Sequence, residues 1–220
     1  MREEAVRIAA RLEGTLRIPD GEPRGVVIVA HPRPTHGGTM RNPLVASLAR
    51  AVAARGFYAL RFNFRGVGLS TGEWTGGLEE WRDVGDAVEH ARTTFPDLRV
   101  GVTAFSFGAL MTLRWLEEGG HADGLALVGV PLRSASLGGR GPRSASDASV
   151  AQDLPPVPDG TFIVAAEHDQ FGTAAELRQA LPRARIVEVR GVDHFFVGKR
   201  DEVGRLVADE LERTLASTFP

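Results

Sequence analysis

Ser106 is the residue of this chain most clearly placed to do chemistry. It lies in the motif AFSFG at 104–108, where a β-branched run ends and a helical apolar pattern begins. A serine on a tight strand-to-helix turn, with small residues two places to either side, is typical of a nucleophile elbow. There the hydroxyl stands above the sheet, at the positive end of the new helix. The pattern predicts a nucleophilic serine, and the plainer alternative is a small residue in a tight turn.

A nucleophilic serine needs an imidazole as its base and a carboxylate that orients the imidazole. Asp169 follows a predicted strand at 162–166, and His194 follows the last predicted strand at 186–189. Parallel strands end at one edge of their sheet, so both side chains are expected at the edge that carries Ser106. The sequence therefore predicts Ser106, Asp169 and His194 as a catalytic triad.

Two neighbouring carboxylates are rivals for the place of Asp169. Glu167 lies two residues earlier and shares one side of the extended chain with Asp169, because side chains alternate along a strand. Asp193 adjoins His194, which makes a good side-chain geometry to the ring difficult. His168 points away from Asp169 in an extended chain and is interpreted as structural.

The tetrahedral intermediate of acyl transfer also needs backbone N–H donors. The elbow supplies one, the amide of Phe107. The second is expected from the segment HPRPTHGGTM at 31–40, which follows an apolar run. Because proline has no N–H, we choose Arg33 as this donor, with Pro32 and Pro34 stiffening the loop. His31 is expected to brace the same loop; a metal site with His36 is a lesser alternative, since no acidic residue lies nearby.

Aromatic side chains cluster near the predicted triad in sequence. Some are expected to line a substrate pocket and the rest to belong to the core. The pocket candidates are Phe105, Phe171, Phe195 and Met40.

Composition excludes several classes of protein. The chain has 220 residues, a size that suits one α/β domain over 1–220, and it has no cysteine, which rules out disulfides, thiolate metal sites and a cysteine nucleophile. Its net charge is −2, and the sequence has no basic stripe that would bind nucleic acid or anionic membranes. No apolar run approaches the roughly 20 residues of a membrane span, and no signal peptide is recognisable. We expect a cytoplasmic protein that acts on a small molecule without a metal or other cofactor.

The elements that must position these residues alternate along the chain. Apolar residues at every second place from Val6 to Leu12, a turn at Gly14 and a continuation to Ile18 predict an antiparallel hairpin. Continuous apolar runs then alternate with helical patterns, which predicts a doubly wound, mostly parallel sheet. The segment 134–156, rich in Ser, Gly, Arg and Pro, is expected to be a mobile loop or minimal lid.

With these motifs the chain resembles the α/β-hydrolase superfamily over essentially its full length, and more narrowly the small capless serine hydrolases related to dienelactone hydrolases and bacterial esterases. The matching segments are 31–40, RFNFRGVGLSTG at 61–72, 104–108, AEHDQFG at 166–172 and VDHFF at 192–196. The resemblance implies an α/β-hydrolase fold without a cap domain, the Ser…Asp…His order of the triad, and an oxyanion hole at Phe107 and near Arg33. Asn63 and Ala104 depart from the family pattern, which has Asp and Gly there. Dienelactone hydrolases proper use a cysteine, so that activity is not expected.

Hydrolysis of small carboxylic esters through an acyl-enzyme is the predicted function. A thioester, amide or peptide substrate remains open, because the same triad can attack each of these bonds. A non-catalytic ligand-binding scaffold is a second alternative. A nucleotide-binding Rossmann or flavodoxin-like protein is a third and weaker one, since no Gly-x-Gly-x-x-Gly motif follows the first strands.

Overall fold

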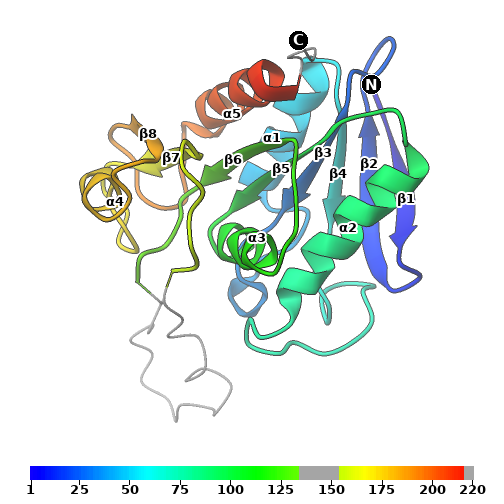
Figure 1. Ribbon diagram of the computed structural model, residues 1–220, viewed down its shortest axis with the longest axis horizontal. Coiled ribbons are helices and arrows are strands. Elements are labelled where there is room, and N and C mark those ends of the chain that lie inside the picture. The colour runs from blue at the N-terminus through cyan, green and yellow to red at the C-terminus, as the bar shows by residue number, and fades with distance from the viewer. Residues whose placement is uncertain (134–153, 216–220) are drawn as a thin grey trace.

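One eight-stranded sheet forms the centre of the computed structural model, which describes residues 1–133 and 154–215 (Figure 1). The strands lie in the order β1-β2-β4-β3-β5-β6-β7-β8. Strand β2 pairs antiparallel with β1 and with β4, and the remaining pairs are parallel. The predicted mostly parallel sheet with an N-terminal hairpin is thereby confirmed. The strands are β1 Arg2–Ile8, β2 Leu12–Ile18, β3 Val26–Ala30, β4 Tyr58–Phe62, β5 Val100–Phe105, β6 Gly124–Val128, β7 Phe162–Ala166 and β8 Arg185–Val189.

Helices cover both faces of the sheet and enclose two apolar cores. Helices α1 and α5 pack against each other and bury their apolar stripes in one core. Helices α2, α3 and α4 contribute to the other, and Figure 1 shows α2 and α3 crossing the sheet on the side toward the viewer. The helices are α1 Pro43–Ala54, α2 Glu80–Thr94, α3 Phe107–Glu117, α4 Ala174–Ala180 and α5 Arg200–Leu215, and a short 3-10 helix spans Pro34–His36.

Local sequence accounts for the main boundaries. Strands β3 and β5 are buried at every residue, as expected for parallel strands covered on both faces. Helix α1 begins after Asn42, whose Oδ1 accepts the N–H of Leu44 at 2.9 Å, and Pro43 occupies the first turn. Both features match the helix start expected from the Asn-Pro pair.

The hairpin turn differs from the sequence prediction. The chain reverses at Ala9 and Ala10, which have φ of 48° and 56°, and Gly14 lies inside β2 opposite Val6. A Cβ at position 14 would come within 2.8 Å of Val6 Cγ2 and 3.2 Å of the Arg61 carbonyl oxygen. Gly14 therefore permits a close approach between strands, and the predicted turn at Gly14 is wrong.

The segment expected to be a mobile loop or minimal lid, 134–156, lies outside the described residues up to residue 153. Beyond it, Leu154 and Val157 are partly buried and pack against the core under α2 and α3. Within the described part of the chain, no helix is long and apolar enough to cross a membrane.

Candidate active site

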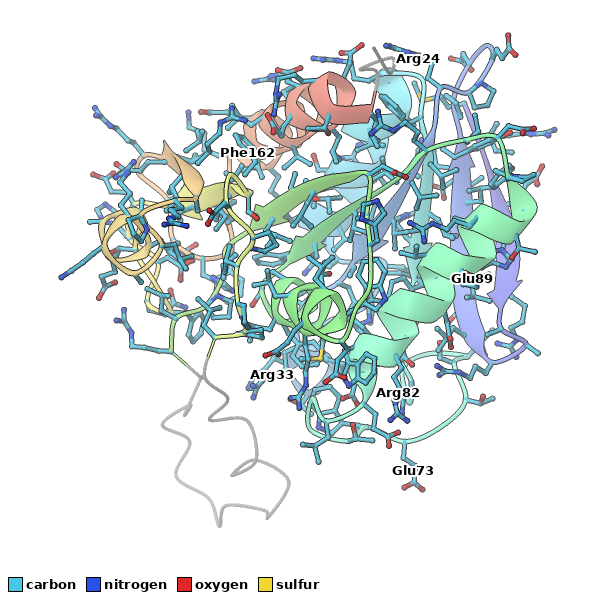
Figure 2. The ribbon with its side chains drawn as sticks, viewed as in Figure 1. Arg24, Arg33, Glu73, Arg82, Glu89 and Phe162 are labelled. Atoms are coloured by element: carbon cyan, nitrogen blue, oxygen red, sulfur yellow. The ribbon has the colours of Figure 1, made fainter. Side chains whose placement is uncertain are left out.

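The carboxyl ends of the parallel strands share one edge of the molecule. Figure 2 marks Arg24 and Phe162, which lie at the starts of β3 and β7, toward the upper side. Arg33 and Glu73, which follow β3 and β4, lie at the lower side in the same view. Segments that leave β5, β7 and β8 must therefore emerge at the lower edge.

Ser106 occupies the single residue between β5 and α3, with φ 57° and ψ −115°. A positive φ is unfavourable for a residue with a Cβ and persists only where the surroundings hold it. Here the Ser106 N–H donates to the Val128 carbonyl of β6 at 2.9 Å, and the Ser106 carbonyl accepts the Ala109 N–H at 2.9 Å. The neighbouring strand and the first turn of α3 thus fix the strained turn from both sides.

Hydrogen bonds join Ser106, His194 and Asp169 in one chain. His194 Nε2 lies 2.8 Å from Ser106 Oγ, and His194 Nδ1 lies 2.7 Å from Asp169 Oδ2. The other carboxylate oxygen of Asp169 accepts the Phe171 N–H at 2.9 Å. Because a carboxylate only accepts, Nδ1 carries the imidazole proton and leaves Nε2 as an acceptor for the serine hydroxyl. This arrangement can remove a proton from Ser106 as it attacks an electrophile.

Rings enclose His194 on several sides. Phe105 lies 5.0 Å from the imidazole centroid with an interplanar angle of 33°, and Phe171 and Phe195 present edges at 4.7 and 5.7 Å. Phe105 is buried, Phe171 is half-buried, and Phe195 is 52% exposed. The structure thus brings three of the four pocket candidates around the imidazole, and Phe195 is the one most open to a ligand from solvent.

Met40, the fourth candidate, lies at the far end of the loop after β3. Its N–H donates to Asn63 Oδ1 at 2.8 Å, its carbonyl accepts from Arg61 at 3.2 Å, and the Thr15 hydroxyl approaches its sulfur at 3.8 Å. These contacts anchor the loop to β2 and to β4 with the turn that follows it, on the other side of β3 from β5. A pocket role for Met40 stays a prediction.

The rival carboxylates are engaged elsewhere. Glu167 Oε2 accepts the Gly191 N–H at 2.8 Å, and Asp193 Oδ1 accepts the Phe195 N–H at 3.0 Å. The largely exposed imidazole of His168 lies 3.7 Å from Glu167. Asp169 is the carboxylate that the structure places on His194, and it is 1% exposed.

The loop after β3 lies directly against the start of α3. A Cβ added to Gly108 would approach the carbonyl oxygens of His31 and Ala30 to 2.7 and 2.9 Å. The segments that carry the amides of Phe107 and Arg33 therefore touch at the carboxyl edge of the sheet. The fold brings together the two segments that the sequence analysis predicts to carry the oxyanion donors.

His31 is fully buried at the head of this loop. Its Nδ1 lies 2.7 Å from the Pro32 carbonyl oxygen, and its Nε2 accepts the Phe64 N–H at 3.1 Å. Burial lowers the pKa of His31 to about 4, so the ring is neutral at pH 7. Since both ring nitrogens are engaged, His31 is unsuited to bind a metal together with His36. Within the described residues, no three His, Asp or Glu side chains are grouped to hold one.

Sequence reasoning did not single out Trp74 or Asp83. The Trp74 ring lies 5.1 Å from the ring of Phe107, and buried Asp83 accepts hydrogen bonds from the backbone and guanidinium of Arg65. These contacts hold the segment between β4 and α2 against the elbow. The Arg-Gly pair at 65–66 signals a turn in the sequence, but no motif identifies Asp83 of α2 as the partner of Arg65.

Comparisons with known proteins relate the chain to a described family. The family described as serine aminopeptidase, S33 matches residues 21–146, more than half of the chain. An uncharacterised protein of Rickettsia prowazekii (strain Madrid E) is 25% identical over 211 residues, which cover 91% of this chain and 84% of that protein.

Two solved structures extend the likeness over nearly the whole chain. An alpha-beta serine hydrolase homologue from Coxiella burnetii is 27% identical, with a TM-score of 0.74, and covers 96% of this chain and 97% of its own. XC6422 from Xanthomonas campestris, described as a serine hydrolase without lid, is 25% identical, with a TM-score of 0.78, and covers 99% of this chain and 96% of its own.

Proposed function

We propose that this chain, which belongs to the S33 serine aminopeptidase family of α/β hydrolases, hydrolyses small carboxylic esters through an acyl-enzyme on Ser106. One observation carries the proposal: the continuous hydrogen-bonded chain from Ser106 Oγ through His194 to Asp169. In it His194 is the base and Asp169 the orienting carboxylate.

The reaction takes two steps. Ser106 Oγ attacks the carbonyl carbon while His194 Nε2 takes its proton, and the amides of Phe107 and Arg33 donate to the oxyanion that forms. As the intermediate collapses, the alcohol leaves with the proton from His194. Water then attacks the acyl-enzyme, His194 takes a proton from it, and the acid leaves as Ser106 recovers its hydrogen.

Exposure of the site favours small or short-chain esters. Ser106 is half-buried, and Phe195 beside the buried His194 is 52% exposed, so among the described residues the site meets solvent at Phe195. A long acyl chain would lie partly in water there and gain little from burial. Nitrophenyl esters of rising chain length test this point, and kcat/KM is expected to be highest for the shortest acyl groups.

A peptide substrate is the second candidate, because the family description names aminopeptidases. An aminopeptidase needs an anionic group for the substrate ammonium. Asp169 accepts from the imidazole of His194, and the rival carboxylates Glu167 and Asp193 accept from backbone N–H groups. Aminoacyl nitroanilides compared with nitrophenyl esters separate the two, and faster cleavage of the anilides would favour the peptidase.

A fluorophosphonate probe tests the assignment of Ser106. The folded protein should gain the mass of one adduct, and the Ser106→Ala variant should gain none. The urea-unfolded protein is the matched control, because it contains the same serines without the triad geometry. A folded protein that takes up no probe would contradict the proposal and favour a non-catalytic binding scaffold.

A further inference from the structure

The Pro32–Arg33 peptide contains the N–H group assigned to the oxyanion hole. A peptide plane turns about ψ of its first residue and φ of its second. The ring of Pro32 restricts φ at position 32, and Pro34 restricts the conformation of Arg33 before it, so ψ of Pro32 is the angle that neither ring fixes. Another group must set the direction of the Arg33 N–H.

His31 holds the other end of the same peptide. Its Nε2 accepts the Phe64 N–H at 3.1 Å, so Nε2 carries no proton. The proton of the neutral ring is then on Nδ1, which donates to the Pro32 carbonyl oxygen at 2.7 Å. The Pro32–Arg33 peptide is trans, and in a trans peptide the C=O and the N–H point in opposite directions. Holding the Pro32 carbonyl therefore fixes the direction of the Arg33 N–H.

We propose that His31 is a positioning residue that aims the Arg33 N–H at the oxyanion formed on Ser106. The inference rests on the proposed hydrolytic function and goes one step further, since it names the group that preorganises the second donor. His31 acts through the peptide and does not touch the substrate.

Aromatic packing links His31 to the other donor. The Phe64 ring lies 4.8 Å from the His31 ring at 70° and 5.5 Å from the Phe107 ring at 78°. Position 108 lies directly against the His31 carbonyl. One packed unit thus sets the relative positions of both donor segments, and the His31 ring is its hydrogen-bonding member. Burial also keeps this ring neutral, with a pKa of about 4, which preserves its donor and acceptor sides at pH 7.

Two substitutions each keep one hydrogen bond of the His31 ring and remove the other. Asn places an amide N–H where Nδ1 lies and keeps the donor to Pro32, whereas Gln places an oxygen where Nε2 lies and keeps the acceptor for Phe64. On a short nitrophenyl ester, His31→Asn should keep kcat within about tenfold of the parent, while His31→Gln should lose on the order of 10²-fold in kcat with KM little changed. Loss of a preorganised donor affects the transition state more than the bound substrate, which is why kcat carries the effect.

The melting temperature of each variant is measured beside its kcat, to separate a loss of stability from a loss of donor position. A purely structural role predicts that kcat falls with the melting temperature, whichever bond is kept. His31→Phe retains the ring packing and lacks both nitrogens, so its kcat should match that of His31→Gln. It replaces His31→Gln in the comparison if the Gln variant does not fold. Equal kcat losses in the Asn and Gln variants, or an unchanged kcat in both Gln and Phe, would overturn the assignment of His31.

The same assay distinguishes this inference from the function on which it rests. A parent protein that neither hydrolyses the ester nor takes up the fluorophosphonate contradicts the proposed function and, with it, the oxyanion role of His31. A reactive parent whose Gln and Phe variants react equally fast contradicts the His31 assignment alone.

Discussion

Gly129 lies directly against the imidazole of His194. A Cβ at position 129 would come within 3.2 Å of His194 Cε1 and 3.1 Å of Phe105 Cε2, and the residue has φ 55°. Its N–H donates to the Val164 carbonyl at 2.9 Å, so the backbone has little room to retreat. The segment that leaves β6 therefore limits the space beside the imidazole at Cε1.

Gly129→Ala should displace the imidazole and lower kcat on the order of 10- to 100-fold, since small misplacements of a catalytic group are costly. Gly160→Ala is the matched control, because Gly160 also has a positive φ, of 76°, but a Cβ there meets nothing within 4 Å. The control should lose stability through backbone strain while its kcat stays near that of the parent. Steady-state kinetics on one ester decides the comparison, and equal kcat in the two variants would contradict the proposed contact effect.

Asp169→Asn should reduce kcat by a factor on the order of 10⁴, as for loss of an orienting carboxylate in other triads. The reason is specific to this site. The Phe171 N–H requires an oxygen on its side of the amide, so the NH₂ group would face His194 Nδ1. The imidazole would then carry its proton on Nε2 and could no longer accept the Ser106 proton.

Asp193→Asn and Glu167→Gln are the controls for this prediction. Both keep an oxygen that can accept the backbone N–H now bound by the carboxylate. Their kcat should stay within a few-fold of the parent. If either control lost as much activity as Asp169→Asn, the choice of orienting carboxylate would be wrong.

Asn63→Asp should destabilise the protein by about 1–3 kcal/mol at pH 7, because it would leave two carboxylates facing each other in a largely buried site. Asn63 Nδ2 donates to Glu13 Oε2 at 2.7 Å, and its Oδ1 accepts the Met40 N–H at 2.8 Å. An amide satisfies both neighbours, whereas a carboxylate satisfies only Met40. Asn63 therefore suits the neighbours it has in this chain.

The swap Glu13→Gln with Asn63→Asp should recover part of the lost stability, because the new Gln amide can donate to the new carboxylate, while the Leu69 N–H loses Glu13 Oε2 as its acceptor. Urea unfolding of the parent, both single variants and the double variant gives the coupling energy as a double-mutant cycle. A double variant as unstable as the sum of its single variants would contradict the charge explanation.

His31 should make stability fall as the solution is acidified from pH 6.5 to 4. Burial lowers its pKa in the folded protein from 6.5 to about 4, so in this window the unfolded chain binds the extra proton. The free energy of unfolding contributed by His31 is present above pH 6.5 and is lost toward pH 4, on the order of 3 kcal/mol in total. Urea midpoints at pH 7, 5.5 and 4.5 measure the slope.

His31→Asn removes the titrating group and is the comparison for this slope. Carboxylates elsewhere titrate in both proteins, so the difference between the two curves isolates His31. The parent should lose more stability per pH unit than the variant, and parallel curves would contradict a depressed pKa.

Much of the candidate site could be predicted from sequence because its residues follow short, strongly patterned strands. The AFSFG turn at 104–108 lies between an apolar β-branched run and a helical stripe, and Asp169 and His194 follow two further runs. Parallel strands deliver their carboxyl ends to one edge, so local periodicity alone implies that these residues meet.

Such patterns do not decide which of two nearby carboxylates contacts His194. Glu167 and Asp169 share one side of the extended chain, and their separation into a backbone acceptor and the His194 partner depends on where Gly191 and the imidazole lie. The sequence does not predict the reversal at Ala9 and Ala10, for a related reason. Position 14 requires a glycine because a side chain there would meet the neighbouring strands. The local alternation of apolar residues carries no information about that contact.

By itself, the sequence determined the strand-helix alternation, the hairpin, the strained serine turn and the chain order of Ser106, Asp169 and His194. These features depend on side-chain periodicity and on the conformational limits of single residues, which act over a few positions. Only the tertiary structure decided which carboxylate meets His194, which nitrogen of His31 carries the proton, and why position 129 holds a glycine. Those outcomes depend on distances of a few ångströms between segments far apart in the chain, and such distances exist only once the core has packed.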